Sequence, residues 1–561
     1  MRKTVIVLGG GVGGLSVAHE LAERGFRVRV FERKPLFGGK ARSMEVANTG
    51  RGGRRDLPGE HGFRFFPNFY KHVTDTMKRI PYPGNPDGVF DNIVHGTRAQ
   101  IARAGKMSII ASARYPRTVE DWVVALKAVC NGAELGIPDP EVMFYIGRLL
   151  VLLTSCEERR VGEYEKIPWW DFIDAANKSA AYQQFLARGM TRSMVAIRAE
   201  EGSTRTVGYV GLQLTLGLLK RVEPVDRVLN GPTNEVWIDP WVSYLKSLGV
   251  EFDTGARLER FHLDGSRVSH VTVSQAGRSC DVTGDYYVSA LPAEVMAPLV
   301  TEEMKRAAPS LAHLDKLRTA WMNGIQFYLE RDVPVVHGHT IYIDSPWALT
   351  SISQRQFWRP GAFAGYGDGR LGGILSVDIS DWTSPGILYG RPAMDCTAEE
   401  IKDEVWAQIQ AHLNVDGARQ LEDANLLGWF LDPDIEFPNP SQVTNLEPLL
   451  INTAGSLDYR PEAETEIPNL LLAADYVRTY TDLASMEAAN EAARRATNAV
   501  LDREGAAAPR AALWPFEEPD CFKPMRAYDR LRFRFGLPHA EWLQALRPHL
   551  AEVLSGAGHD W

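Results

Sequence analysis

A strand, a glycine-rich turn and a helix open the chain and constrain its fold more than any other feature. The apolar, β-branched run Thr4–Leu8 is typical of a buried parallel strand. It leads directly into a turn in which Gly9, Gly11 and Gly14 satisfy the pattern G-x-G-x-x-G. Glycine is needed there for the tight bend, for close approach of the backbone to a pyrophosphate and for packing of the next helix. That helix would end at Gly25 and direct its unpaired N–H groups at the pyrophosphate.

An acid and a second glycine turn extend this pattern. The second predicted strand, Phe26–Phe31, ends at Glu32, which is placed to accept hydrogen bonds from a ribose hydroxyl. The turn Gly38–Ser43 (GGKARS) then brings two cations, Lys40 and Arg42. A nicotinamide dehydrogenase has no requirement for this second turn, whereas it can complete the pyrophosphate cradle of a flavin dinucleotide. The first forty-three residues therefore predict a dinucleotide site, and the second turn favours a flavin.

Composition excludes some classes of protein. A net charge of −9 over 561 residues argues against a general nucleic-acid binder. The five cysteines show no C-x-x-C or Cys/His spacing, so we expect reduced thiols, a cytoplasmic setting and no metal site. The apolar stretch Met143–Thr154 carries Arg148 and is too short to span a bilayer. We expect a core helix there, and the alternative is an amphipathic surface that contacts a membrane peripherally, on its inner face.

Three later segments repeat the chemistry of a flavin site. Glu60–Phe66 (EHGFRFF) opens an aromatic strand, and Asp285–Leu291 (DYYVSAL) is a strand that ends at a proline. Near the C-terminus, Leu470–Tyr476 (LLLAADY) is followed by Asp482–Asn490 (DLASMEAAN), which predicts a buried strand ending in an acid, a loop and a helix starting near Leu483. The acid can bind ribityl hydroxyls, and the helix N-terminus can stabilise negative charge at the flavin N1–C2=O edge.

Together with the N-terminal turn, these segments resemble the phytoene-desaturase branch of the flavin amine oxidase superfamily, which includes carotenoid desaturases and squalene-type oxidoreductases. The resemblance implies FAD as the cofactor and an α/β fold, in which a Rossmann-type FAD-binding domain carries an inserted α+β substrate domain. Two positions depart from the family pattern: Ala474 stands where glycine is usual, and Lys40 where arginine is frequent. Neither departure removes a hydrogen-bonding atom.

The resemblance assigns residues to the cofactor. The glycine turn, Glu32, Arg33 and Lys40 would contact the adenosine and diphosphate half, and Arg257 and Leu258 the adenine. Arg64 and Phe65 would lie near the flavin, with Asp475 and Met486 on its ribityl and isoalloxazine side. The full expected set is Gly9, Gly11, Val12, Gly13, Gly14, Glu32, Arg33, Lys40, Arg42, Arg64, Phe65, Arg257, Leu258, Asp475 and Met486.

The segments that resemble the flavin domain are discontinuous, which predicts the domain organisation. We expect the FAD-binding domain to comprise residues 1–97, 226–300 and 446–502, and the substrate-binding domain residues 98–225 and 301–445. Residues 503–561 would form a C-terminal extension. The number of subunits cannot be read from the sequence.

The sequence leaves two main reactions open. No HExxH motif, nucleophile elbow or Cys/His cluster is present, so the flavin would carry the chemistry. The leading expectation is desaturation of a lipophilic, isoprenoid-type substrate by hydride transfer to flavin N5, with a quinone or O2 as electron acceptor. The alternative is oxidation of an amine or amino-acid-derived substrate in an aromatic cage, for which Tyr476 and Tyr480 are candidates. No catalytic residue is assigned; His61 is the nearest titratable candidate for a proton shuttle, and a structural histidine is the other interpretation.

Two further classes of function are open. One is a flavin-binding protein with a structural or carrier role, and the other is a different redox reaction, such as isomerisation or reductive dehydroxylation.

Overall fold

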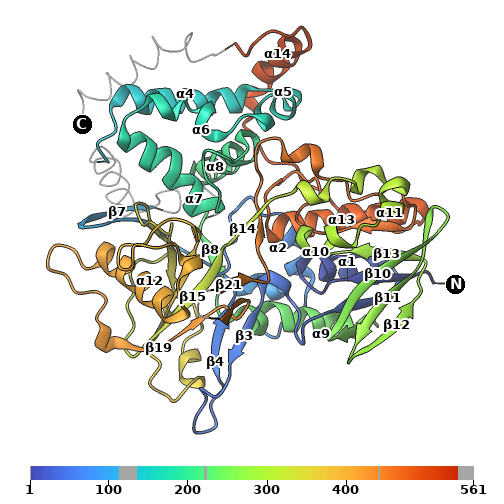
Figure 1. The fold of residues 1–561 in the computed structure, drawn as a ribbon, viewed down its shortest axis with the longest axis horizontal. Coiled ribbons are helices and arrows are strands. Elements are labelled where there is room, and N and C mark those ends of the chain that lie inside the picture. Colours follow the sequence, from blue (N-terminus) through green and yellow to red (C-terminus); the bar gives the residue numbers. More distant parts are fainter. Residues whose placement is uncertain (1, 113–134, 220–223, 440–441, 541–561) are drawn as a thin grey trace.

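The computed structural model describes residues 2–112, 135–219, 224–439 and 442–540 (Figure 1). The two largest sheets of these residues lie side by side (Figure 1). The five-stranded sheet contains the first strand of the chain, and the other sheet has seven strands. The last residues of the expected C-terminal extension, 541–561, lie outside the described ranges.

A five-stranded parallel sheet carries the N-terminal glycine turn. Its strand order is β23-β13-β1-β2-β9, and each neighbouring pair is parallel. The order brings the start, the middle and the end of the chain together in one sheet, and most of its strands have the buried faces that are typical of a parallel sheet. The strands are β1 (Thr4–Leu8), β2 (Arg27–Glu32), β9 (Glu251–Thr254), β13 (Tyr286–Ser289) and β23 (Leu470–Leu472).

Helices and a small antiparallel sheet surround this parallel sheet. The first and last helices of the group, α1 and α13, pack against each other, and buried alanines on α13 allow their close approach. The small sheet has the order β10-β11-β12. The helices are α1 (Val12–Glu23), α2 (His72–Arg79), α9 (Asp239–Ser247), α10 (Ala293–Met296), α11 (Glu302–Ala307) and α13 (Met486–Arg503), and the strands are β10 (Ala256–Asp264), β11 (Arg267–Gln275) and β12 (Arg278–Val282).

A seven-stranded mixed sheet forms the second body, with the order β19-β15-β18-β17-β16-β6-β7. Strands from two distant segments meet in it, because β16 pairs in parallel with β6. The domain boundaries themselves remain a prediction. The strands are β6 (Arg98–Arg103), β7 (Lys106–Ser112), β15 (Asn323–Leu329), β16 (Thr340–Tyr342), β17 (Thr350–Ser353), β18 (Gly373–Ile379) and β19 (Leu426–Leu431).

Four two-stranded ribbons complete the sheets of the described residues. They are β3 (Ser43–Val46) with β4 (Leu57–Glu60), β5 (Ile93–His95) with β8 (Arg227–Leu229), β14 (Thr319–Ala320) with β22 (Leu449–Leu450), and β20 (Ile435–Asn439) with β21 (Gln442–Asn445). The last helix before the C-terminal signature, α12 (Ala398–Leu413), packs against the seven-stranded sheet.

A layer of helices lies at the top of the second body (Figure 1). Its members are α4 (Asp139–Thr154), α5 (Glu157–Gly162), α6 (Trp169–Phe172), α7 (Met190–Val195), α8 (Thr204–Leu219) and α14 (Lys523–Arg534). The predicted core helix over Met143–Thr154 is α4, which buries Val151, Leu152 and Leu153. Arg148 Nε donates a hydrogen bond to the Phe172 carbonyl at 2.8 Å, so its guanidinium is held inside the helical layer. Within the described ranges, none of the helices is both long and apolar enough to cross a bilayer.

The C-terminal helix α14 is fixed to the helical layer by one buried ion pair. Asp529 and Arg159 are almost fully buried, and Arg159 Nε lies 2.9 Å from Asp529 Oδ1. The Cys156 N–H also donates to Asp529 Oδ2 at 2.9 Å. A buried carboxylate with two such partners holds α14 against α5.

We expect Asp529→Ala to destabilise this docking. The substitution leaves the buried Arg159 without one of its acidic partners, which should cost about 3 kcal/mol. Urea unfolding and limited proteolysis should show a lower midpoint and faster cleavage within residues 503–540. The exposed Asp520 offers a matched control, and Asp520→Ala should leave both unchanged. Equal behaviour of the two variants would contradict this account of the docking.

Candidate active site

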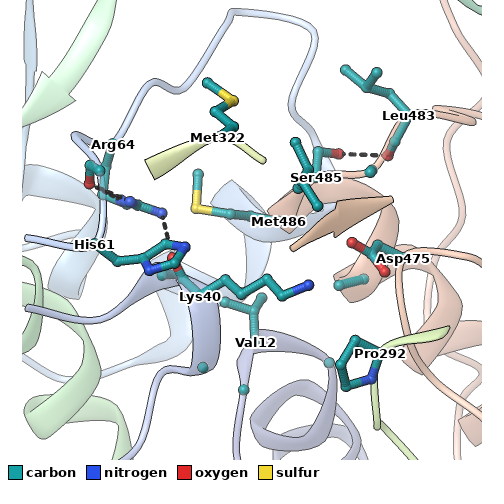
Figure 2. A pocket seen from close by; sticks show the side chains of 18 of the residues that line it. Val12, Lys40, His61, Arg64, Pro292, Met322, Asp475, Leu483, Ser485 and Met486 are labelled. Atoms are coloured by element: carbon teal, nitrogen blue, oxygen red, sulfur yellow. Dashed lines mark hydrogen bonds between the residues drawn. The ribbon is translucent and has the colours of Figure 1, made fainter. Parts of the chain in front are cut away.

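A cavity of about 850 Å³ runs from the N-terminal glycine turn into the space beside the seven-stranded sheet. Most of the residues expected at the cofactor line it. Figure 2 shows Lys40, Arg64, Met486 and Asp475 around its centre, with Val12 at the glycine turn. The expected residues along the cavity are Gly9, Gly11, Val12, Gly13, Glu32, Arg33, Lys40, Arg64, Phe65, Arg257, Leu258, Asp475 and Met486, together with His61.

Backbone segments meet at the glycine turn so closely that side chains cannot fit. A Cβ added to Gly13 would lie 2.0 Å from the Ala473 carbonyl oxygen, and one added to Gly14 would lie 1.9 Å from the Gly9 carbonyl oxygen. The two glycine turns are also in contact, because the Gly38 N–H donates to the Gly10 carbonyl at 2.9 Å. This arrangement fits a pyrophosphate, which needs a smooth backbone surface at a helix N-terminus. Gly14 itself packs α1 on β1 and is not among the cavity residues.

Glu32 lies at the end of β2, where the sequence pattern places the ribose acceptor. Its Oε2 accepts a hydrogen bond from the Gly10 N–H at 2.7 Å, and its Oε1 accepts one from the Lys34 N–H at 2.8 Å. Each carboxylate oxygen can accept more than one hydrogen bond. The backbone donors therefore fix the carboxylate at the cavity wall and leave acceptor capacity for ribose hydroxyls.

The two cations of the second glycine turn have different surroundings. Lys40 lines the cavity, and its Nζ lies 2.9 Å from Glu294 Oε1. Arg42 is 2% exposed and is not among the described cavity residues, because its guanidinium binds Glu447 and Asp434. Arg42 therefore joins the turn to residues of the β20–β21 region instead of offering its charge to a diphosphate. The sequence spacing could not reveal these acids, which lie 392 and 405 positions further along the chain.

The flavin end of the cavity is formed by the C-terminal signature and the segment after β4. Helix α13 begins at Met486, not near Leu483, because Ser485 caps it: its Oγ accepts from the Ala488 N–H at 3.2 Å. Asp475 follows β23 and faces the cavity (Figure 2). On the opposite side, Arg64 donates to the Gly62 carbonyl at 3.0 Å through Nε.

His61 lines the same cavity and lies beside a buried acid. Its Nδ1 lies 2.6 Å from Asp432 Oδ2. This contact suits a structural histidine, and the role of His61 as a proton shuttle remains a prediction.

An apolar chamber continues from the flavin end. Strands of the seven-stranded sheet form one wall, helix α8 another, and the aromatic segment after β4 a third. Its apolar lining includes Phe63, Phe65, Phe69, Ala99, Ile101, Val210, Leu214, Met322 and Ile341. A chamber of this kind accepts a lipophilic chain and excludes water.

Sequence analysis missed three polar residues in this chamber: Asp226, His339 and Asp378. They come from segments that precede β8 and β16 and from β18, and no local motif marks them. Burial raises the pKa of the Asp378 carboxyl to about 7, although the positive charge of Arg64 opposes this shift. Perturbed acids in a cavity are a frequent mark of function.

Comparison with known proteins places this geometry in a family. Residues 7–80 match the NAD(P)-binding Rossmann-like domain, and residues 173–501 match the family described as flavin containing amine oxidoreductase. The chain belongs to the flavin containing amine oxidoreductase family. The match confirms the predicted fold class and the flavin cofactor, FAD.

Curated relatives confirm the predicted branch. The chain is 22% identical over 366 residues to 15-cis-phytoene desaturase of Narcissus pseudonarcissus, covering 64% of this chain and 60% of that protein. It is 21% identical over 511 residues to 15-cis-phytoene desaturase of Synechococcus elongatus, covering 89% and 96%. Hydroxysqualene dehydroxylase of Zymomonas mobilis is 24% identical over 300 residues, covering 53% and 64%. The match to the plant enzymes spans about three fifths of their length.

Solved structures share the fold. A putrescine oxidase with bound putrescine has a TM-score of 0.59 at 12% identity and covers 90% of this chain and 100% of that one. A structure titled putative protoporphyrinogen oxidase from Exiguobacterium has a TM-score of 0.57 at 14% identity and covers 90% and 99%. At these identities the likeness concerns the fold alone.

Replacing Glu32 tests the adenosine end of the site. Glu32→Ala removes an acceptor of ribose hydrogen bonds and should weaken FAD binding by about 1.5–3 kcal/mol, or roughly ten-fold to a hundred-fold. The measurement is the dissociation constant of FAD by fluorescence on the deflavinated protein. Glu45→Ala, at an exposed position of β3, should retain the original affinity. An unchanged constant for Glu32→Ala would remove Glu32 from the cofactor site.

Proposed function

We propose that this protein is an oxidoreductase that uses FAD to dehydrogenate a lipophilic, isoprenoid-type substrate. The observation that carries this proposal is the continuity of one cavity from the glycine turn to the apolar chamber. A substrate in the chamber would lie next to the residues proposed to hold the flavin. The printed names of the relatives, 15-cis-phytoene desaturase and hydroxysqualene dehydroxylase, support the isoprenoid class.

Different residues of the cavity would bind different parts of FAD. The glycine turn and Glu32 would hold the adenosine diphosphate, and Asp475 the ribityl hydroxyls. The N-terminus of α13, at Met486, would direct its N–H groups at the ring. When bound, FAD supplies the acceptor for a hydride from a substrate CH₂.

The apolar chamber contributes orientation and electrostatics. Its walls would hold a chain in register with the flavin end and exclude water. The faces of Phe65 and Phe69 can stabilise positive charge that develops on an allylic carbon. The chain's own part in the reaction is then positioning and charge stabilisation, and no strong protein base is required. We propose a quinone or O2 as the final electron acceptor.

Amine oxidation is the second candidate function. The observation that supports it is that putrescine oxidase has the same fold. The aromatic pair expected for its cage does not lie in the cavity. Tyr476 is fully buried, and Tyr480 is 44% exposed with the Arg495 guanidinium over its ring. Neither is among the described residues that line the cavity. The geometry therefore favours the lipophilic substrate.

The pH dependence of flavin reduction separates the two reactions. An amine must lose its proton before oxidation, so its rate should rise with pH through the ionisation of the amine. A hydrocarbon has no such group. We expect anaerobic stopped-flow bleaching by an isoprenoid to be constant above pH ~8, where Asp378, whose pKa burial raises to about 7, is already ionised. A steep rise above pH ~8 that moves when the amine is changed would overturn the proposal.

We also propose that the protein contacts the inner face of a membrane peripherally, through α14. Tyr528, Leu531 and Phe535 recur at helical spacing and are 45%, 54% and 79% exposed. Arginines 530, 532 and 534 lie among them. Exposed apolar side chains with interspersed arginines are typical of a helix that lies on anionic lipid.

Vesicle co-sedimentation tests this contact. The protein should pellet with phosphatidylglycerol vesicles at low salt. Phe535→Asp should lower the partition coefficient between vesicles and water roughly ten-fold, because it removes a large apolar group. Leu248→Asp, at a 37% exposed position after α9, is the matched control and should bind as the original protein does. Equal partitioning of the two variants would exclude α14 as the contact.

A further inference from the structure

The apolar chamber contains a hydrogen-bonded pair, Asp226 and His339. His339 Nδ1 lies 2.6 Å from Asp226 Oδ1, and the His339 N–H donates to Asp226 Oδ2 at 2.9 Å. An ionised carboxylate only accepts hydrogen bonds, so Nδ1 carries the proton. The contact with Asp226 fixes the direction of the other ring nitrogen, Nε2, which is an acceptor when the ring is neutral.

The acceptor Nε2 of His339 is buried and has no hydrogen-bond partner in the protein. Aromatic rings hold the imidazole in place: its centroid lies 4.6 Å from that of Phe65 and 5.1 Å from that of Phe63. Burying a polar atom without a partner costs stability. The remainder of the ring is well bound, so the free atom points to a partner that arrives with a ligand.

Asp378 supplies a second group of the same kind. It lies on β18, lines the same chamber and is 6% exposed, and its Oδ1 is buried without a hydrogen-bond partner. Because its carboxyl titrates near neutral pH, it can donate as the acid or accept as the carboxylate. Asp378 pairs with Thr350 on β17, and Thr350 pairs with Ile341 on β16, two residues after His339. All four residues line the cavity, so Asp378 and His339 reach the chamber from the same part of the sheet.

Glu60 is a nearby buried acid whose oxygens both have hydrogen-bond partners within the protein. Burial raises the pKa of Glu60 to about 7 as well. Both of its oxygens are satisfied, however, because the Thr233 N–H donates to Oε1 and the Thr233 hydroxyl to Oε2, each at 2.9 Å. Glu60 is also absent from the described lining of the cavity. Glu60 is therefore satisfied within the protein, whereas His339 Nε2 and Asp378 Oδ1 have no partner and belong to residues that line the chamber.

We infer that His339 Nε2 and Asp378 Oδ1 bind a hydroxyl group on an otherwise lipophilic substrate. A hydroxyl can donate its one proton to Nε2 and accept a hydrogen bond from the protonated Asp378 carboxyl, whereas a hydrocarbon can do neither. The inference rests on the proposed function and narrows its substrate class to a hydroxylated isoprenoid. Such a site discriminates against a substrate without the hydroxyl, because both buried groups would then stay unpaired.

The test compares two lipids on the FAD-loaded protein. One is a linear isoprenoid hydrocarbon, and the other is the same chain with one hydroxyl. Binding is measured from the perturbation of the flavin spectrum, and reduction from anaerobic bleaching. The hydroxylated lipid should half-saturate the protein at a roughly ten-fold lower concentration, which corresponds to the loss of about one hydrogen bond. Equal half-saturation concentrations would overturn the inference.

Variants locate the preference. His339→Phe keeps a ring between the aromatic neighbours, and Asp378→Leu removes the carboxyl; each should bring the ratio of half-saturation concentrations close to one while the hydrocarbon value changes little. Asp378→Asn retains a hydrogen-bonding group and should restore part of the preference. Glu60→Gln, the matched control at the satisfied acid, should keep the full ratio. FAD content and the melting temperature confirm that each variant is folded.

The outcomes separate the inference from the proposed function. If neither lipid bleaches the flavin, the proposed dehydrogenation fails, but the binding ratio and its response to His339→Phe still decide the inference. If the full ratio survives in His339→Phe and Asp378→Leu, these residues do not bind the hydroxyl. If an amine binds tightly and loses affinity in Asp378→Leu, the site holds a cation and the hydroxyl assignment is wrong.

Discussion

The close backbone contact between the first turn and the last strand is the constraint on which the rest of the structure depends. Gly13 approaches the Ala473 carbonyl so closely that no side chain fits between them. This contact brings the N-termini of α1 and α13, encoded more than 470 positions apart, to one edge of the parallel sheet. Two helix N-termini at one edge create a region of positive potential, which suits a dinucleotide carrying a diphosphate at one end and an electron-accepting ring at the other.

The flavin half could be predicted from sequence because its contacts follow local rules. A strand, a glycine turn and an acid at fixed spacing determine where Gly11 and Glu32 lie, and β2 begins one residue later than expected. The role of Arg42 could not be predicted from such local rules. Its position in a glycine turn suggested a diphosphate contact, but its burial is determined by Asp434 and Glu447, which only tertiary folding brings near. The start of α13 also differs from the prediction, because a serine cap and not the apolar pattern determines it.

The substrate half could not be predicted in the same detail. Its walls combine β6, β16, β18 and α8, which pack by non-local pairing, and the register of such strands is not written in any short motif. Asp226 and His339 are 113 positions apart and meet because β5 pairs with β8 while β6 pairs with β16. The polar groups that distinguish a hydroxylated from an unsubstituted lipid are therefore visible only in the folded chain.

The central claim is that cofactor and substrate share one cavity, with the isoalloxazine ring of FAD next to the substrate. A crystal structure of the protein with FAD and a hydroxylated isoprenoid bound tests this claim most directly. The account predicts the diphosphate over Gly11 and Gly13, the isoalloxazine between Arg64 and Met486, and the lipid chain between the seven-stranded sheet and α8. A flavin ring directed away from the chamber, or a lipid bound outside it, would contradict the account.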